Sequence, residues 1–160
     1  MYKITVLCVG SLKERYIRDA VAEYEKRLHA FCRFEVIEVT EERCPDNPSE
    51  NDIKRVIDAE GERLLRKIPA GAYPMALCIE GKERSSEAFA EEIARLAVGG
   101  DGHIAFLIGG SWGLSDAAKA KAKASLSFSP MTFPYQLARV MLCEQLYRAM
   151  QILHGGQYHK

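Results

Sequence analysis

Three segments of the chain combine residue types that could bind a small molecule. They are Leu77 to Lys82 (LCIEGK), Leu107 to Ser115 (LIGGSWGLS) and Ser127 to Pro134 (SFSPMTFP), and each follows or ends an apolar run. Ligands of open α/β sheets bind outside the carboxyl ends of the strands. Because all three segments stand at the ends of predicted strands, they indicate one shared ligand site.

The middle segment contains the glycine turn Gly109-Gly110-x-x-Gly113. Glycine lacks Cβ and tolerates positive φ, so the backbone of such a turn can approach a ligand closely. No Gly-Lys-Ser/Thr follows, so it is not a P-loop, and it matches the dinucleotide fingerprint G-x-G-x-x-G poorly. The alternative is a tight turn in which glycine relieves strain.

The last segment is stiff because Pro130 and Pro134 fix φ and remove two amide donors. Pro134 also suits the first turn of a helix. Phe128, Met131 and Phe133 add apolar surface beside free backbone groups, a combination that suits a flat heteroaromatic ring with polar edges. The alternative is a connection that only packs into the core.

Arg139 falls on the apolar side of the helix predicted after Pro134. At about 100° per residue, that apolar stripe consists of Ala138, Leu142, Leu146, Ala149, Met150 and Leu153. A charge there must reach a partner, an interface edge or a ligand, or extend along the apolar surface to water. Glu144 and Arg148 lie on the far side as an i,i+4 pair. Met141 and Ile152 add apolar surface that suggests a homodimer.

The chain ends with Tyr158, His159 and Lys160 after Gly155-Gly156. These side chains offer stacking, proton transfer and phosphate contact, as an RNA-modifying site needs. The last four residues, 157–160, would usually fray, however, and composition alone favours a frayed tail.

Strand and helix patterns alternate along the chain and must position these segments. The predicted strands are 3–10, 34–39, 74–81, 103–110 and 125–129; the predicted helices are 13–30, 50–67, 85–98, 116–124 and 135–154. Ser49 is the expected N-cap of the second helix, and Ser85 or Ser86 that of the third. The sequence therefore predicts an α/β fold, a mostly parallel sheet with helices on both faces, in one domain of 160 residues.

Composition limits the classes of function. Lysine plus arginine equals aspartate plus glutamate at 22 each, so no overall field attracts a polyanion. No apolar run approaches the ~18–20 residues that span a bilayer. Five widely spaced cysteines without a C-x-x-C pair indicate free thiols in a reducing cytoplasm. The four scattered histidines do not suggest a metal site. The Ala/Lys run 119–123 is interpreted as a solvated helix.

Together these segments resemble the RlmH family of SPOUT (α/β-knot) methyltransferases over the whole chain. The resemblance is carried by VGSLKERYIRDAVAEYEKRL, LCIEGKERSSEAFA, FLIGGSWGLS and LSFSPMTFPYQLARVMLCEQLYRAMQILHGGQYHK. It implies a homodimer that methylates N3 of pseudouridine 1915 in 23S rRNA with S-adenosylmethionine. The neutral net charge fits recognition of assembled ribosomes in the cytoplasm, and neither a metal nor a membrane is expected. The resemblance also implies one SPOUT domain over residues 1–160, with about 74–160 threaded as a trefoil knot.

The resemblance further implies which residues act. The expected cofactor contacts are Leu77, Gly109, Phe128, Ser129, Pro130, Met131, Thr132 and Phe133. We hypothesise that Arg139 stabilises charge on a ring carbonyl while His159 or Tyr158 positions the base or assists proton removal. Cys78 stands where the family often has an acidic residue, and Tyr135 where it often has histidine.

Two other readings remain open from the residues alone. One is a non-catalytic dimeric module that binds RNA or the ribosome on a knot scaffold; the zero net charge argues against strong independent RNA binding. The other is a dinucleotide-binding oxidoreductase, which the late position of the glycine turn disfavours.

Overall fold

The computed structural model describes residues 1–160, and its five strands form one parallel sheet. The strands are β1 (Tyr2–Val9), β2 (Cys32–Val39), β3 (Tyr73–Leu77), β4 (His103–Ile108) and β5 (Ala124–Leu126). Their order is β2-β1-β4-β3-β5, and every neighbouring pair is parallel. The predicted parallel sheet is confirmed.

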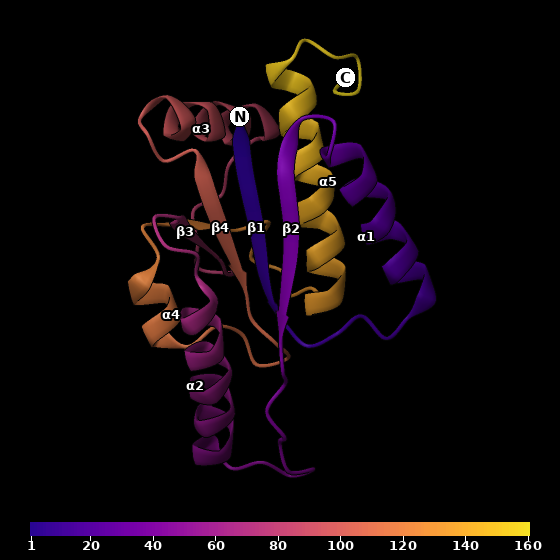
Figure 1. The fold of residues 1–160 in the computed structure, drawn as a ribbon. Helices are drawn as coiled ribbons and strands as arrows, with labels where there is room; N and C mark the ends of the chain where they lie inside the picture. The colour runs from indigo at the N-terminus through magenta and orange to yellow at the C-terminus, as the bar shows by residue number, and fades with distance from the viewer.

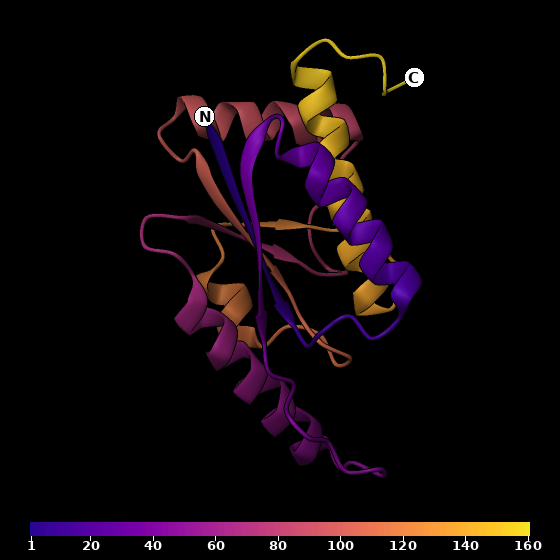
Figure 2. The same cartoon turned by 45° about the vertical axis from the view of Figure 1, so that its right-hand side comes forward.

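Helices cover both faces of this sheet, as predicted. α1 (Arg15–Leu28), α3 (Ser86–Val98) and α5 (Tyr135–Leu153) pack on one face around the larger apolar core. α2 (Glu50–Lys67) and α4 (Asp116–Lys121) cover part of the other face with a smaller core. Figure 1 and Figure 2 show α1 and α5 side by side on one side of the sheet and α2 with α4 on the other.

The helix starts follow from local sequence. Ser49 caps α2 in a capping box, since its Oγ accepts from the Asp52 amide at 3.1 Å and Asp52 accepts from the Ser49 amide at 2.9 Å. Ser85 caps α3 by accepting from the Ala88 amide at 3.1 Å. α5 begins directly after its N-cap Pro134, whose ring nitrogen carries no hydrogen, and no side chain caps this helix. The predicted cap at Ser49 is confirmed, and Ser85 rather than Ser86 caps α3.

Several predicted strand and helix ends were wrong. β3 ends at Leu77 rather than at residue 81, because Cys78 to Gly81 form a turn closed by the Gly81 amide and the Cys78 carbonyl at 3.1 Å. α4 ends at Lys121 rather than at 124, and β5 is shorter than predicted. The Lys123 amide donates to the Pro74 carbonyl at 2.9 Å, so pairing with the sheet overrides the helix propensity of the alanines.

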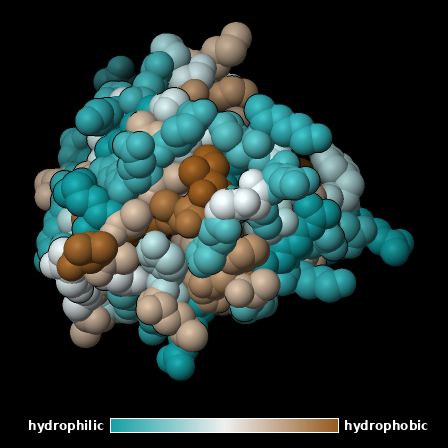
Figure 3. Space-filling model, turned by 90° about the horizontal axis from the view of Figure 1, so that it is seen from above, coloured by the Kyte–Doolittle hydropathy of each residue, from teal (hydrophilic) through white to brown (hydrophobic).

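The C-terminal tail is packed, so the frayed tail that composition favours is wrong. The Arg148 guanidinium lies 4.7 Å from the centroid of the Tyr158 ring, and the Tyr158 hydroxyl donates to Glu144 at 3.1 Å. His159 Nε2 lies 2.8 Å from Glu87 Oε1. The tail lies at the end of the sheet where β1 begins (Figure 1). Seen from that end, the surface is largely hydrophilic, with a hydrophobic group of atoms near its middle (Figure 3).

None of the helices is long and apolar enough to cross a membrane. The trefoil threading of about 74–160 and the domain boundaries stay predictions.

Candidate cofactor site

The three segments singled out in the sequence meet at the carboxyl ends of β3, β4 and β5. Leu77 of β3 is in register with Ile108 of β4 and with Leu126 of β5, so the chain leaves the sheet from three adjacent points. A cavity of about 350 Å³ opens there. The residues that line it are Leu77, Cys78, Ile79, Glu80, Ile108, Gly109, Gly110, Ser111, Trp112, Gly113, Leu114, Lys119, Phe128, Ser129, Met131, Thr132, Phe133, Tyr135 and Ala138.

Most of the expected cofactor residues line this cavity. They are Leu77, Gly109, Phe128, Ser129, Met131, Thr132 and Phe133, and only Pro130 does not reach it. The structure thus brings the expected set together, while their contacts with a cofactor stay a prediction.

The glycine turn forms one wall and is tightly closed. The Gly113 amide donates to the Gly110 carbonyl at 3.0 Å, and Gly113 has a φ of +88°. A Cβ at Gly109 would lie 2.4 Å from the Gly113 carbonyl carbon, far inside van der Waals contact. The two interpretations of this turn are therefore compatible: it is a tight turn, and it lines the cavity.

The loop between β5 and α5 forms the opposite wall and is tied down at its start. The Ser127 hydroxyl donates to the Ile79 carbonyl at 2.8 Å, and the Met131 amide donates to the Ser129 hydroxyl at 2.8 Å. The loop is therefore held against the turn that follows β3, and its backbone groups have fixed positions. The Met131 side chain is 71% exposed.

A pair of opposite charges lies on the cavity wall. Glu80, in the turn after β3, forms an ion pair with Lys119 of α4. The hydrogen bond between them lowers the pKa of Glu80 and raises the pKa of Lys119. The interpretation of 119–123 as a purely solvated run is thus wrong for Lys119. Beside this pair, burial raises the pKa of the Cys78 thiol, which faces the same cavity.

Arg139 reaches a partner within the chain, one of the alternatives that its position left open. It is 1% exposed, and its guanidinium donates to the Glu38 carboxylate at 2.6 Å and to the Gly10 carbonyl at 2.9 Å. Its neighbour Ala138 lines the cavity, but Arg139 does not. In one chain Arg139 therefore ties the first turns of α5 to the ends of β1 and β2, and its catalytic role stays a prediction.

Tyr158 and His159 lie beyond the far end of α5 from the cavity. α5 has 19 residues, so its two ends are about 27 Å apart at 1.5 Å per residue. The structure therefore does not bring the three expected catalytic residues, Arg139, Tyr158 and His159, together within one chain.

Sequence reasoning missed the role of Tyr135 in the cavity wall. Its hydroxyl donates to the carboxylate of Glu41, in the loop between β2 and α2, although the two residues are 94 positions apart. Burial, followed by the Glu41 carboxylate, raises the pKa of Tyr135. The position of Tyr135 directly after Pro134 could have indicated a place in the cavity wall, because the start of this helix faces the ends of the strands. Trp112 was also missed, although it stands inside the glycine turn.

Comparison with known proteins decides the family. A family model described as "Predicted SPOUT methyltransferase" matches residues 2–159. Ribosomal RNA large subunit methyltransferase H of Bacillus pumilus is 49% identical over 157 residues, which cover 98% of this chain and 99% of that protein. The chain belongs to the RlmH family of SPOUT methyltransferases. The RlmH protein of Streptococcus thermophilus is similarly close, at 48% identity over 99% of each chain.

Solved structures show the same fold for this RlmH-family chain. A probable methyltransferase from Bordetella pertussis superposes with a TM-score of 0.56 at 15% identity, covering 93% of this chain and 96% of that one. A probable methylase family protein from Haemophilus influenzae gives 0.54 at 12% identity, covering 99% and 71%. At these identities the likeness concerns the fold alone.

Proposed function

We propose that this chain is an S-adenosylmethionine-dependent methyltransferase that methylates N3 of a pseudouridine in 23S ribosomal RNA. The observation that carries the proposal is the cavity built jointly by the three segments at the ends of β3, β4 and β5. Its RlmH relatives, nearly half identical over their full length, are named ribosomal RNA large subunit methyltransferases.

The residues present fit the cofactor. The cavity, about 350 Å³, lies in the range of about 300–1,000 Å³ usual for small-molecule sites. Leu77, Gly109 and the stretch 128–133 would hold the adenosine part largely through backbone groups, since glycine and a tied loop expose them. When bound, S-adenosylmethionine supplies an electrophilic methyl group. The chain itself contributes positioning, which can account for much of the rate of such a transfer.

The imide N3–H must lose its proton, and we assign this assistance to Tyr158 or His159. Because these residues lie at the far end of α5 from the cavity of their own chain, a second copy must bring its tail to the site. The surface of α5 beside the cavity suits a self-complementary interface, with Leu137 39% exposed and Met141 half-buried in a neighbouring hollow. The proposed enzyme is therefore a homodimer.

The zero net charge supports recognition of an assembled ribosome in the cytoplasm rather than of free RNA. Phosphate attraction dominates the affinity of proteins that bind naked nucleic acid, and this chain has no excess cation to supply it. Ribosomal proteins and the shape of the assembled ribosome would then provide the remaining contacts.

Calorimetric titration tests the cofactor. We expect S-adenosylmethionine to bind and NAD not to bind. Gly109→Ala should abolish binding, because the added Cβ would lie 2.4 Å from the Gly113 carbonyl carbon. Gly102→Ala is the matched control, since its added Cβ would meet nothing nearer than 3.9 Å. Binding of NAD instead, or unchanged S-adenosylmethionine affinity in Gly109→Ala, contradicts the proposal.

A further inference from the structure

A second cavity of about 360 Å³ opens beside the cofactor cavity and shares Ser111 and Trp112 with it. Its other wall is the loop 41–44 between β2 and α2, with two residues of α2 behind it. The connections after β1 and β4 leave these adjacent strands in opposite directions. Such a switch point is where open α/β sheets place their ligands.

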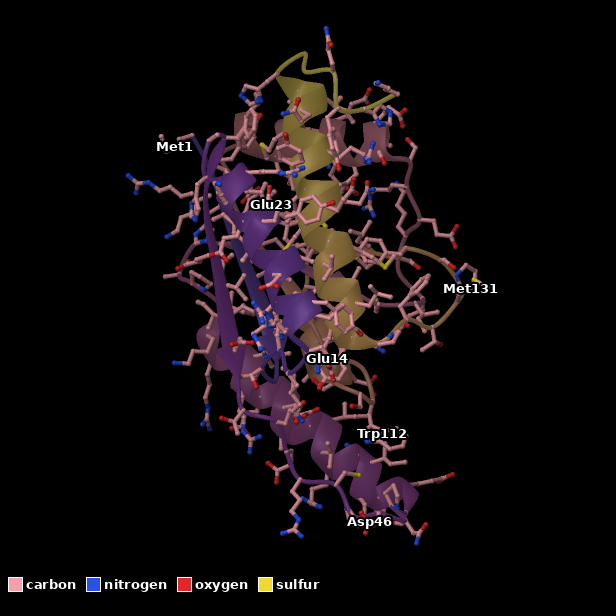
Figure 4. The ribbon with its side chains drawn as sticks, turned by 90° about the vertical axis from the view of Figure 1, so that its right-hand side faces the viewer. Met1, Glu14, Glu23, Asp46, Trp112 and Met131 are labelled. Carbon is pink, nitrogen blue, oxygen red and sulfur yellow. The ribbon has the colours of Figure 1, made fainter.

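Trp112 is the natural stacking surface between the two cavities. It is 45% exposed and is the only tryptophan of the chain. Figure 4 shows it on the same side of the molecule as Met131, between Met131 and the loop that carries Asp46. Exposed aromatic rings in RNA-binding proteins stack nucleobases, and each stacked base contributes substantially to affinity.

The charges around the second cavity leave one cation free. Glu42 pairs with Arg55 at 3.5 Å and also with Arg63. Glu41 already accepts a hydrogen bond from the hydroxyl of Tyr135, in the wall of the cofactor cavity. Arg43 lines the second cavity, is exposed and makes no ion pair or side-chain hydrogen bond. It is therefore available for a phosphate.

The floor of the second cavity carries an unsatisfied acceptor. Glu60 of α2 is 4% exposed; one carboxylate oxygen accepts from the Glu42 amide at 3.1 Å, and the other has no partner. It lies beneath the glycine turn, where a Cβ on Gly110 would come within 3.0 Å of the unpartnered oxygen. A buried acceptor without a donor is costly, so a ligand amino group that reaches it gains affinity.

We propose that this second cavity binds a nucleotide of the RNA substrate next to the methylated one. Its base stacks on Trp112, its exocyclic amine donates to Glu60, and its phosphate meets Arg43. Adenine, guanine and cytosine carry such an amine, whereas uracil presents carbonyl oxygens in its place. The inference rests on the proposed function and names further RNA contacts of the same site.

Fluorescence of the single tryptophan tests the site without any methylation. The protein is saturated with S-adenosylhomocysteine, because Trp112 also lines the cofactor cavity, and is then titrated with CMP, AMP, GMP and UMP. N-acetyltryptophanamide corrects for absorbance by the nucleotides. We expect saturable quenching by CMP that is several-fold tighter than by UMP. Equal quenching by the two would overturn the contact with Glu60, and no saturable quenching by any nucleotide would overturn the site.

Variants separate the contacts. Arg43→Ala should weaken CMP binding about tenfold, as expected for loss of a charge-assisted hydrogen bond. Arg33→Ala is the matched control, an exposed arginine of β2 that lines neither cavity. Glu60→Gln, which adds an amide donor, should reduce the preference for CMP over UMP. Unchanged CMP affinity in Arg43→Ala, or unchanged preference in Glu60→Gln, contradicts the respective contact.

Kinetics connect the site to the reaction. Trp112→Ala should raise KM for the ribosomal substrate about tenfold or more, and Trp112→Phe should restore most of the loss. Cofactor affinity is measured separately by calorimetry. If the wild type methylates RNA but nucleotides do not quench and Trp112→Ala leaves KM unchanged, the second site is wrong and the function stands. If nucleotides quench but no RNA is methylated, the proposed function is wrong and the nucleotide site stands.

Discussion

At the scale of single residues, Arg139 is the largest fully buried side chain and is paired rather than free. Arg139→Met keeps the apolar stem but leaves the Glu38 carboxylate and the Gly10 carbonyl without a donor. We expect the free energy of unfolding in urea to fall by about 3 kcal/mol, at the lower end for a broken buried pair because Glu38 is 42% exposed and can be hydrated.

The control for Arg139 is Arg95→Met at an exposed position of α3, with an expected change below about 0.5 kcal/mol. If Arg139→Met were as stable as the wild type, Arg139 would have no structural role. Its burial would then need another explanation, such as a state in which it turns toward substrate.

Cys78 offers a test of the cavity through its thiol. Burial raises the pKa of Cys8 and Cys143 to about 12 and that of Cys32 to about 11, so these thiols should resist alkylation at pH 8. Cys78 lines the cavity and burial raises its pKa above the usual 9.0, so its alkylation should accelerate as pH rises past 9 and should slow when S-adenosylhomocysteine is bound. Partly exposed Cys44 is the internal control, since it lies outside this cavity.

Peptide mass spectrometry follows the labelling of each cysteine. Equal rates at Cys78 with and without saturating S-adenosylhomocysteine would mean that the ligand binds elsewhere.

The residues that could be found from sequence are those with a local backbone meaning. Gly109 indicates a close approach of the backbone to its neighbours, and Pro130 and Pro134 indicate a stiff loop, whatever the surrounding fold. The contact of Tyr135 with Glu41 could not be found, because the sheet joins residues 94 positions apart. The remote placement of Tyr158 and His159 depends on the direction in which α5 leaves the cavity, which the predicted length of the helix alone does not give.

At the scale of elements, α2 and α4 approach each other through Gly61. A Cβ at Gly61 would lie 2.0 Å from the hydroxyl oxygen of Ser115, the N-cap of α4. Gly61→Ala should therefore destabilise the protein by about 1–3 kcal/mol through overpacking. In an exposed helix the same change would stabilise by about 1 kcal/mol. Urea unfolding measures the change, with Glu62→Ala on the exposed side as control, and a gain in stability contradicts the close packing.

Element types were predictable because the apolar patterns are strong, and boundaries were less so where tertiary pairing competes with propensity. Ala122 and Lys123 continue a good helical sequence, yet Lys123 bonds to Pro74 of β3 and ends α4. The cap at Ser49 was predictable because its hydrogen bonds stay within three residues.

At the scale of the whole molecule, the docked tail should respond to acid in a defined range. Hydrogen bonds from its own backbone amide, from His159 and from Ser85 lower the pKa of Glu87 to about 2. A lowered pKa means that this carboxylate supports docking fully above its usual value near 4.5 and loses that support as pH falls toward 2. Tyr158 ring resonances in NMR spectra should therefore keep their docked shifts at pH 5 and lose them only in stronger acid.

Glu87→Gln removes this titrating group and should abolish the part of the acid transition that Glu87 carries, leaving any part carried by Glu144, which accepts from the Tyr158 hydroxyl. A transition of the wild-type tail centred above pH 5 would show that Glu87 does not hold the tail.

Methyl transfer tests the central claim most directly. The protein is incubated with methyl-labelled S-adenosylmethionine and ribosomes from cells that lack the endogenous enzyme, in parallel with separated subunits and naked 23S rRNA. A variant without residues 157–160 is the control, because it should keep cofactor affinity and lose transfer. We predict label in one pseudouridine-containing fragment of 23S rRNA, with assembled ribosomes the best substrate. No label in any RNA, despite measurable cofactor binding, would contradict the assignment and favour a non-catalytic RNA-binding module.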